Sequence, residues 1–241
     1  MLVIIVRLTM EKIKISNKYV GLVEDKDDFI RYVSSQNDGL IIAANAKKIV
    51  NNDNTYTRIF NKAITYPDGK SIVKFMNKKG YNAIKYPGYI MWLDYLKVNQ
   101  RTKKCYFIGA TQEVIDVVVK KALSEFPSLQ IVGYRNGYLK EEDKKGLLIE
   151  FSNLKPDVIF VGTAYPKQEF LMDELTKSYK ALYFGLGGSF NVYAGLVKPV
   201  PEWWEKYIGY ESIYRLIIDP KKIKRQFSNL KFLILATLNK L

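Results

Sequence analysis

The sequence predicts an α/β fold in which helices cover both faces of a mostly parallel sheet, followed by a basic helical extension. One observation is a repeated theme, in which an apolar run of strand length leads through a glycine-bearing loop into a helical pattern. Another is a change of composition near Lys198, after which aromatic and basic residues dominate. We therefore expect a Rossmann-like core over residues 1–197 and an extension over residues 198–241.

Four segments carry the repeated theme: "GLIIAANAKKIVNN", "KKCYFIGATQEVIDVVVKKAL", "PDVIFVGTAYPKQEFLMDEL" and "KALYFGLGGSFNVYAGL". Between the second and the third, "VGYRNGYLKEEDKKGLLIEF" continues the alternation, and its acidic run suits the start of a helix. Crossover connections in such sheets are right-handed, so the loops emerge at the carboxyl edge, where open α/β sheets bind ligands. The pattern thus gathers Asn45, Gly109, Gly162, Gln168 and Gly187 at one rim.

The N-terminal "MLVIIVRLTM" predicts a strand, or residues upstream of a start at Met10, and it is too short to span a bilayer.

The chain has 241 residues and no histidine. This excludes Ser-His and Cys-His nucleophile pairs and most zinc sites. Its one cysteine, Cys105, lies in an apolar run, which predicts a small buried hydrophobe in a reducing compartment.

The formal net charge of +14 predicts an anionic partner. From Lys221 to Leu241 there are six basic residues and no acidic one, interleaved with large apolar side chains. That pattern is typical of a basic amphipathic helix on an anionic membrane surface, more than of a helix in a duplex groove.

The stretch "AITYPDGKSIV" places Asp68 between a proline and a glycine, where an apolar run ends and a helical pattern begins. Pro67, Asp68 and Gly69 are residue types that turns use, so a plain structural turn is one interpretation. The stretch alone favours this interpretation, although in a chain without histidine any acid–base chemistry must fall to carboxylates, lysine or tyrosine.

Three further stretches bear on phosphate and metal binding. "GLGGSF" lets backbone N–H groups approach an anion, although a tight turn explains it equally. "GTAYPKQE" puts Lys167 and Gln168 at the start of a helix at the same edge. "DKD", Asp25 to Asp27, precedes a helical pattern and is explained by the helix start, so we expect no metal site and no cofactor.

The stretches "NAKKIV", "YPDGKSIV", "GTAYPKQE", "GLGGSFNVYAGLVKPVPEWW" and "ESIYRLIIDPKKIKRQ" occur in this order. In order and approximate spacing, from about Val20 to Leu230, they resemble the WecG/TagA/CpsF glycosyltransferases. Members of that family are inverting transferases that move a sugar from a UDP donor onto a polyprenyl-diphosphate-linked sugar. The resemblance implies these two substrates and a cytoplasmic enzyme attached peripherally to the inner face of the plasma membrane.

The resemblance also implies roles for individual residues. Asp68 becomes the candidate general base, and Asn45 and Gln168 are expected to hold the sugars. Arg215, Lys222 and Arg225 are expected to close over the site and meet the diphosphate, although a solvated or lipid-facing basic surface explains them equally. The remaining expected substrate-binding positions are Lys85, Gly109, Gly137, Gly162, Lys167, Gly187, Gly188 and Asn191.

The chain departs from the family pattern around the donor pocket. The family's "RVAGxD" appears as "KYPGYI", with Lys85 in place of arginine and no acid. Asn191 stands where an aspartate is usual, Ala43 where a threonine is expected, and Lys222 where an arginine is usual. Lysine keeps the charge of arginine but loses its bidentate fork. These differences bear on which sugar is transferred more than on the class of reaction.

Two other classes of function stay open at this point. A nucleic-acid-binding protein is suggested by the charge and the 18 tyrosines, but no recognition-helix, RRM or KH pattern occurs, so we expect no nucleic-acid partner. A different sugar-nucleotide-using α/β enzyme, such as an epimerase, would need a dinucleotide fingerprint that is absent. The sequence leaves the oligomeric state open, a homo-oligomer included.

Overall fold

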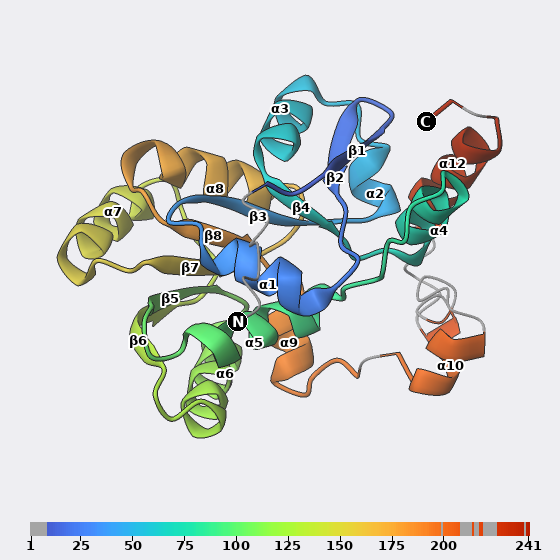
Figure 1. Cartoon of the computed structure of the whole chain (residues 1–241). Coiled ribbons are helices and arrows are strands. Elements are labelled where there is room, and N and C mark those ends of the chain that lie inside the picture. The colour runs from blue at the N-terminus through green and yellow to red at the C-terminus, as the bar shows by residue number, and fades with distance from the viewer. Residues whose placement is uncertain (1–8, 199, 208–213, 215–216, 219–225, 239) are drawn as a thin grey trace, which may run out of the picture.

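The centre of the molecule is a parallel sheet with the strand order β4-β3-β8-β7-β5-β6 (Figure 1). The structure is a computed structural model that describes all residues except 1–8, 199, 208–213, 215–216, 219–225 and 239. Over these residues the sheet has six strands, and the predicted α/β class is confirmed. The strands are β3 (Gly39–Ala44), β4 (Ile64–Pro67), β5 (Lys104–Gly109), β6 (Gln130–Arg135), β7 (Val158–Gly162) and β8 (Leu182–Gly185).

Side chains alternate along each strand and divide the core into two layers. Phe107, Phe160 and Phe184 belong to one layer, and their neighbours Tyr106 and Tyr183 to the other. The first layer is covered by α1 (Lys26–Ser34), α5 (Gly88–Asn99), α6 (Gln112–Glu125) and α9 (Ser189–Tyr193). The second is covered by α2 (Ala46–Ile49), α3 (Asn54–Lys62), α4 (Lys70–Lys78), α7 (Asp143–Leu154) and α8 (Lys167–Ser178) (Figure 1).

Trp92 anchors α5 against the sheet. Its side chain is fully buried, and its ring lies 5.1 to 6.2 Å, centroid to centroid, from four other aromatic rings, those of Phe107, Phe160, Phe190 and Tyr193. Burial of a large apolar side chain contributes about 1.5–3 kcal/mol, and edge-to-face ring pairs add to it. The first residue of α5 is thereby held in a fixed position at the carboxyl edge.

A separate antiparallel hairpin, β1 (Lys12–Ile15) and β2 (Lys18–Gly21), packs beside the edge strand β4. The buried Thr65 hydroxyl joins the two, because it accepts a hydrogen bond from the Gly21 N–H (3.0 Å) and donates one to the Tyr19 carbonyl (2.9 Å). A covered edge strand is protected from pairing with other chains.

The acidic "DKD" stretch opens α1, as predicted. The Asp25 side chain accepts a hydrogen bond from the Asp28 N–H at 2.9 Å, and Asp27 and Asp28 lie in the first turn. Acidic residues are favoured there by the unpaired N–H groups and the helix dipole. Among the described residues, no group of three or more His, Cys, Asp or Glu side chains could hold a metal ion.

The C-terminal part of the chain contains α10 (Glu202–Tyr207) and α12 (Gln226–Thr237), and α12 lies beside α4 (Figure 1). Phe232 of α12 is 1% exposed, and its ring centroid lies 6.2 Å from that of Phe75 in α4. Large apolar side chains on the rest of α12 are exposed: Phe227, Leu230, Leu233 and Ile234. None of the described helices is long and apolar enough to cross a membrane.

Three sequence predictions stay untested, and two of them fall on residues that the structure does not describe. The predicted N-terminal strand falls largely on residues 1–8, and the basic start of the predicted C-terminal helix falls on residues 219–225. The division into units at residue 198 stays a prediction.

Candidate active site

The loops after β3 and β8 lie side by side at the carboxyl edge, because these two strands are neighbours in the sheet. The helices that follow them lie on opposite faces, α2 on one and α9 on the other, as α8 and α6 do after the neighbours β7 and β5. Open α/β proteins bind ligands outside the carboxyl ends of their strands. The β4 loop, which carries Asp68, lies on the other side of β3.

Asp68 is held at this edge by backbone and side-chain hydrogen bonds. The N–H groups of Asp68 and Gly69 both donate to the Ala44 carbonyl, at 3.0 and 3.1 Å. Asp68 Oδ1 accepts a hydrogen bond from the Gly88 N–H (2.9 Å), the first residue of α5. Burial raises the pKa of the neighbouring Tyr66, and the Asp68 charge raises it further. Asp68 is half-buried. The start of α5 orients its carboxylate, and the neighbouring Tyr66 phenol stays protonated at neutral pH.

Asn45 lies against the Asp68 turn. A Cβ added to Gly69 would lie 3.3 Å from both Cα and Cβ of Asn45, so the two loops touch. Asn45 Oδ1 accepts a hydrogen bond from the Lys48 N–H (3.2 Å) and thereby caps α2. The structure thus brings together two of the residues that the sequence assigned to one site.

Gln168 lies beneath the glycine loop that follows β8. Its side chain is 2% exposed, and its Oε1 accepts a hydrogen bond from the Gly187 N–H at 2.6 Å. The expected anion contact of the Gly187 N–H is therefore occupied by Gln168 in this structure. Gln168 supports the loop from below, and its direct contact with a sugar stays a prediction.

A buried ion pair connects the Asn45 loop with Gln168. Lys48 Nζ lies 2.8 Å from Glu169 Oε1, and the two side chains are 8% and 0% exposed. Glu169 Oε1 also accepts a hydrogen bond from Gln168 Nε2 at 3.3 Å. The contacts form one path from α2 through Lys48, Glu169 and Gln168 to the Gly187 loop. The local sequence gives no sign of this pair, because an acidic residue such as Glu169 in the first turn of a helix fits an ordinary helix start.

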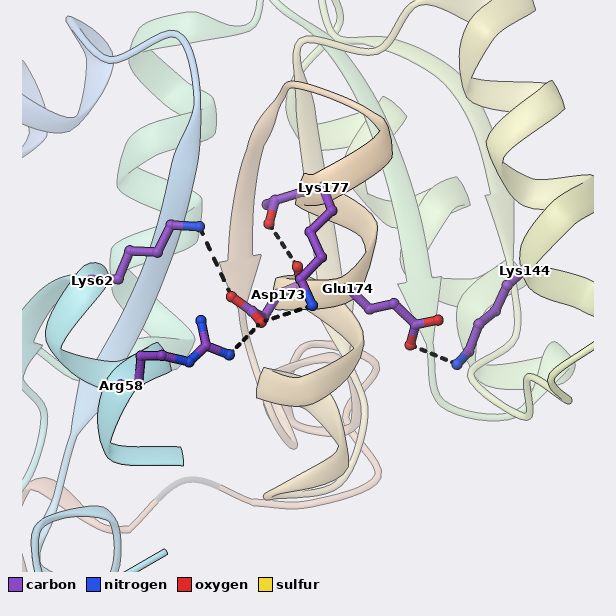
Figure 2. A network of polar contacts seen from close by, with 7 residues as sticks. Arg58, Lys62, Lys144, Asp173, Glu174 and Lys177 are labelled. Atoms are coloured by element: carbon purple, nitrogen blue, oxygen red, sulfur yellow. Dashed lines mark hydrogen bonds and ion pairs between the residues drawn. The ribbon is translucent and has the colours of Figure 1, made fainter. Parts of the chain in front are cut away.

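A second ionic cluster holds the middle of α8 in place (Figure 2). Asp173 is 3% exposed and faces the cations of Arg58 (3.2 Å) and Lys62 (3.9 Å) from α3, and Lys177 (3.6 Å) from its own helix. On the other side of α8, Glu174 pairs with Lys144 of α7 at 2.6 Å. Because α8 is fixed to both neighbouring helices, its first turn presents Gln168 and Glu169 at constant positions.

Three of the predicted site glycines are required for close packing between loops. A Cβ on Gly109 would lie 2.6 Å from the Gly162 carbonyl oxygen, and one on Gly137 would lie 2.8 Å from Thr163 Cγ2. A Cβ on Gly162 would collide with the ring of Phe190. The ends of β5, β6 and β7 therefore close on one another, and a ligand contact at these glycines stays a prediction.

Gly187 and Gly188 differ from these three, because a Cβ on either would meet no heavy atom within 4 Å. Gly187 has φ +55°, which favours glycine, whereas Gly188 has φ −85°. Asn191 follows in α9, where its side chain is half-buried. Open backbone at the start of α9 leaves room for a ligand.

The other predicted residues lie around this opening or outside the described part. Lys85 is half-buried and precedes Tyr86, whose N–H donates to the Pro67 carbonyl at 2.9 Å, so it lies near the Asp68 turn. Lys167 is exposed at the first residue of α8. Arg215, Lys222 and Arg225 fall outside the described residues, so their placement over the site is not tested.

Fold and site together define a Rossmann-like α/β protein whose candidate site residues Asp68, Asn45 and Gln168 lie at the carboxyl edge of its sheet. The chain belongs to the WecG/TagA/CpsF glycosyl transferase family, whose model matches residues 12–241. The family resemblance drawn from the sequence is thereby confirmed.

Two similar proteins come from Bacillus, and both are named N-acetylglucosaminyldiphosphoundecaprenol N-acetyl-beta-D-mannosaminyltransferase. The protein of Bacillus subtilis strain 168 is 35% identical over 170 residues, which is 69% of this chain and 65% of the relative. The protein of Bacillus spizizenii is 33% identical over 171 residues, with the same coverage of 69% and 65%. The chain thus spans slightly less than two thirds of the length of these relatives.

Proposed function

We propose that this chain is an inverting glycosyltransferase that transfers a sugar from a UDP donor to a polyprenyl-diphosphate-linked sugar in surface polysaccharide synthesis. The observation that carries the proposal is the position of Asp68, a carboxylate oriented by the start of α5 and touching the Asn45 loop at the carboxyl edge. Family membership and the names of the Bacillus proteins support this class of reaction. They favour N-acetylmannosamine as the sugar, with its uronic acid and glucose as alternatives.

In this mechanism, Asp68 takes the proton from the acceptor hydroxyl as that oxygen attacks the anomeric carbon of the donor. The bond between the anomeric carbon and the UDP oxygen breaks on the opposite face, so the configuration inverts. The electron pair of that bond leaves with UDP, and the proton on Asp68 is later released to water. The Gly88 N–H keeps the carboxylate aimed during this step, and Asn45 helps to hold the sugars.

The leaving diphosphate needs positive charge or hydrogen-bond donors. We assign this role to Lys85 and to Arg215, Lys222 and Arg225 of the C-terminal part, with the exposed Gly188 region as a further donor. The proposal assigns no metal ion to the reaction. The reason is that the chain has no histidine and that the carboxylates of the described residues form no cluster that could hold a metal ion.

The acceptor lipid places the reaction at a membrane, so we propose peripheral attachment to the inner face of the plasma membrane. The exposed apolar side chains of α12 and the net charge of +14 support this attachment.

The test is a transfer assay with a panel of UDP-sugars and a polyprenyl-diphosphate-linked N-acetylglucosamine acceptor. One UDP-sugar should give a product whose new linkage has, by NMR, the anomeric configuration opposite to that of the donor. Addition of EDTA should leave the rate unchanged. Retention of configuration would overturn the inverting mechanism, and absence of product with every donor would overturn the proposed function.

A further inference from the structure

A pocket of about 290 Å³ lies between α2, the loop after β7 and α12, and none of the candidate site residues described above lines it. Lys47 and Val50 line it from the α2 side, Tyr165 from the β7 loop, and Phe227 and Lys231 from α12. It contains two ammonium groups and apolar surface, and no Asp or Glu lines it. An anionic ligand with an apolar portion fits this lining.

The described contacts hold the polar wall of the pocket in place. Lys47 Nζ lies 4.4 Å from the centroid of the Tyr165 ring, a cation–π geometry. The Tyr165 hydroxyl in turn accepts a hydrogen bond from Asn51 Nδ2 at 2.6 Å. The pocket therefore has a fixed wall on the core side and a second wall made by α12, which the buried Phe232 anchors to the core.

The place of the pocket in the fold suggests which anion it takes. Lys47 is two residues beyond Asn45, a rise of about 3 Å along α2, and Asn45 touches the Asp68 turn. At its other side, Phe227 is 64% exposed, and the apolar side chains of Leu230 and Ile234 continue along α12. The α2 wall of the pocket therefore begins directly after the Asn45 loop, and its α12 wall continues into an exposed apolar surface.

We propose that this pocket binds the diphosphate of the lipid-linked acceptor, with Lys47 and Lys231 as its charge partners and Phe227 beside the first carbons of the lipid. The inference rests on the proposed function, because it assumes a polyprenyl-diphosphate-linked acceptor. In such an acceptor the diphosphate lies between the sugar and the lipid, which matches the order of Asp68, the two lysines and the apolar side chains of α12. Two ammonium groups suit a diphosphate better than a lipid headgroup with one negative charge. The volume is at the lower end of the range for small-ligand pockets, about 300–1,000 Å³, which suits a head group better than a whole nucleotide sugar.

The test compares the double variant Lys47→Gln/Lys231→Gln with a control of equal charge change, Lys97→Gln/Lys120→Gln. The control lysines are exposed on α5 and α6, which cover the opposite face of the sheet. Binding is measured, without donor, to phosphatidylcholine vesicles that contain undecaprenyl diphosphate and to matched vesicles that contain phosphatidylglycerol. Free pyrophosphate serves as competitor.

The pocket variant should bind undecaprenyl diphosphate vesicles at least about tenfold more weakly than the control, because it lacks both proposed charge partners of the diphosphate. Its binding to phosphatidylglycerol vesicles should match that of the control. Free pyrophosphate should compete with the undecaprenyl diphosphate vesicles for binding to the wild-type protein. In the transfer assay, the KM for the acceptor should rise and the KM for the donor should not.

Three results would overturn the inference. Equal losses in the pocket variant and the control would show that only net charge matters. An equal loss on phosphatidylglycerol vesicles would indicate a general headgroup site, and a raised donor KM with an unchanged acceptor KM would indicate a nucleotide site. Because vesicle binding needs no turnover, it separates a failure of this inference from a failure of the proposed reaction.

Discussion

The two halves of the carboxyl edge use the same residue types for opposite purposes. At the ends of β5, β6 and β7, Gly109, Gly137 and Gly162 let the loops close on one another. In the loop after β8, beside the end of β3, a Cβ added to Gly187 or Gly188 would meet no heavy atom within 4 Å. A glycine in a strand-end loop therefore has more than one explanation. Only the packing shows whether it makes room for protein atoms or leaves the backbone open.

Side-chain hydrogen bonds occur in both halves. In the open half, Asp68, Asn45 and Gln168 accept hydrogen bonds from the N–H groups of Gly88, Lys48 and Gly187. In the closed half, the loops after β5 and β6 are joined by the bond from the Gly137 N–H to the Ala110 carbonyl at 2.9 Å and by the bond from Asn136 Nδ2 to Gln112 Oε1 at 3.2 Å. Substitutions of exposed residues in the open half should affect turnover, and substitutions of buried or tightly packed residues in either half should affect stability first.

The largest effect on stability should come from the buried pair that supports the open half. Glu169→Gln leaves the Lys48 charge without a countercharge in the interior, which costs about 3–5 kcal/mol. The measurement is urea unfolding. The double variant Lys48→Met/Glu169→Leu should recover most of the loss, because an apolar pair of similar volume needs no countercharge. A single variant as stable as the wild type would show that the pair does not fix these loops.

A matched pair of alanine substitutions tests the difference between the glycines. Gly162→Ala forces the new methyl into the Phe190 ring and should destabilise the protein by about 1–3 kcal/mol. Gly188→Ala has a compatible φ of −85° and no neighbour, so its free energy of unfolding should change by less than about 0.5 kcal/mol. Gly188→Ala should instead lower kcat/KM in the transfer assay. Equal unfolding free energies in the two variants would contradict the comparison.

The smallest effect concerns Cys105, the second residue of β5, which lies near the end of the strand opposite to the carboxyl edge. Burial raises the pKa of its thiol to about 12, and its side chain is 1% exposed. A thiol whose pKa is raised stays protonated and unreactive below that pH. Iodoacetamide at pH 8 should therefore label the folded protein far more slowly than the protein in urea. Equal labelling rates would show that the core around β5 opens readily.

Much of this arrangement could be predicted from the sequence, because it depends on local patterns. The alternation of apolar runs, glycine loops and helical patterns predicted the parallel sheet and a rim that includes Asn45, and the family resemblance added Asp68 to the same site, where the two loops meet. The acidic start of α1 was explained correctly by a cap at Asp25. These inferences needed only neighbouring residues and the handedness of crossovers.

What sequence analysis missed depends on contacts between residues that are distant along the chain. The partner of Gly162 is Phe190, and the partner of Glu169 is Lys48. Nothing in the local pattern of Glu169 distinguishes a buried ion pair from an ordinary helix start. One indication of the buried pair was available. Glu169 lies at a helix start that follows a buried strand, and such a position is close to the core.

The central claim is that the carboxylate of Asp68 is the base of the transfer reaction, and Asp68→Asn tests it most directly. Asparagine keeps a side-chain oxygen for the Gly88 N–H, so the start of α5 and the melting temperature should be preserved. The account predicts a loss of kcat of about 10²–10⁴-fold with an unchanged melting temperature. A folded Asp68→Asn protein that transfers sugar at the wild-type rate would contradict it.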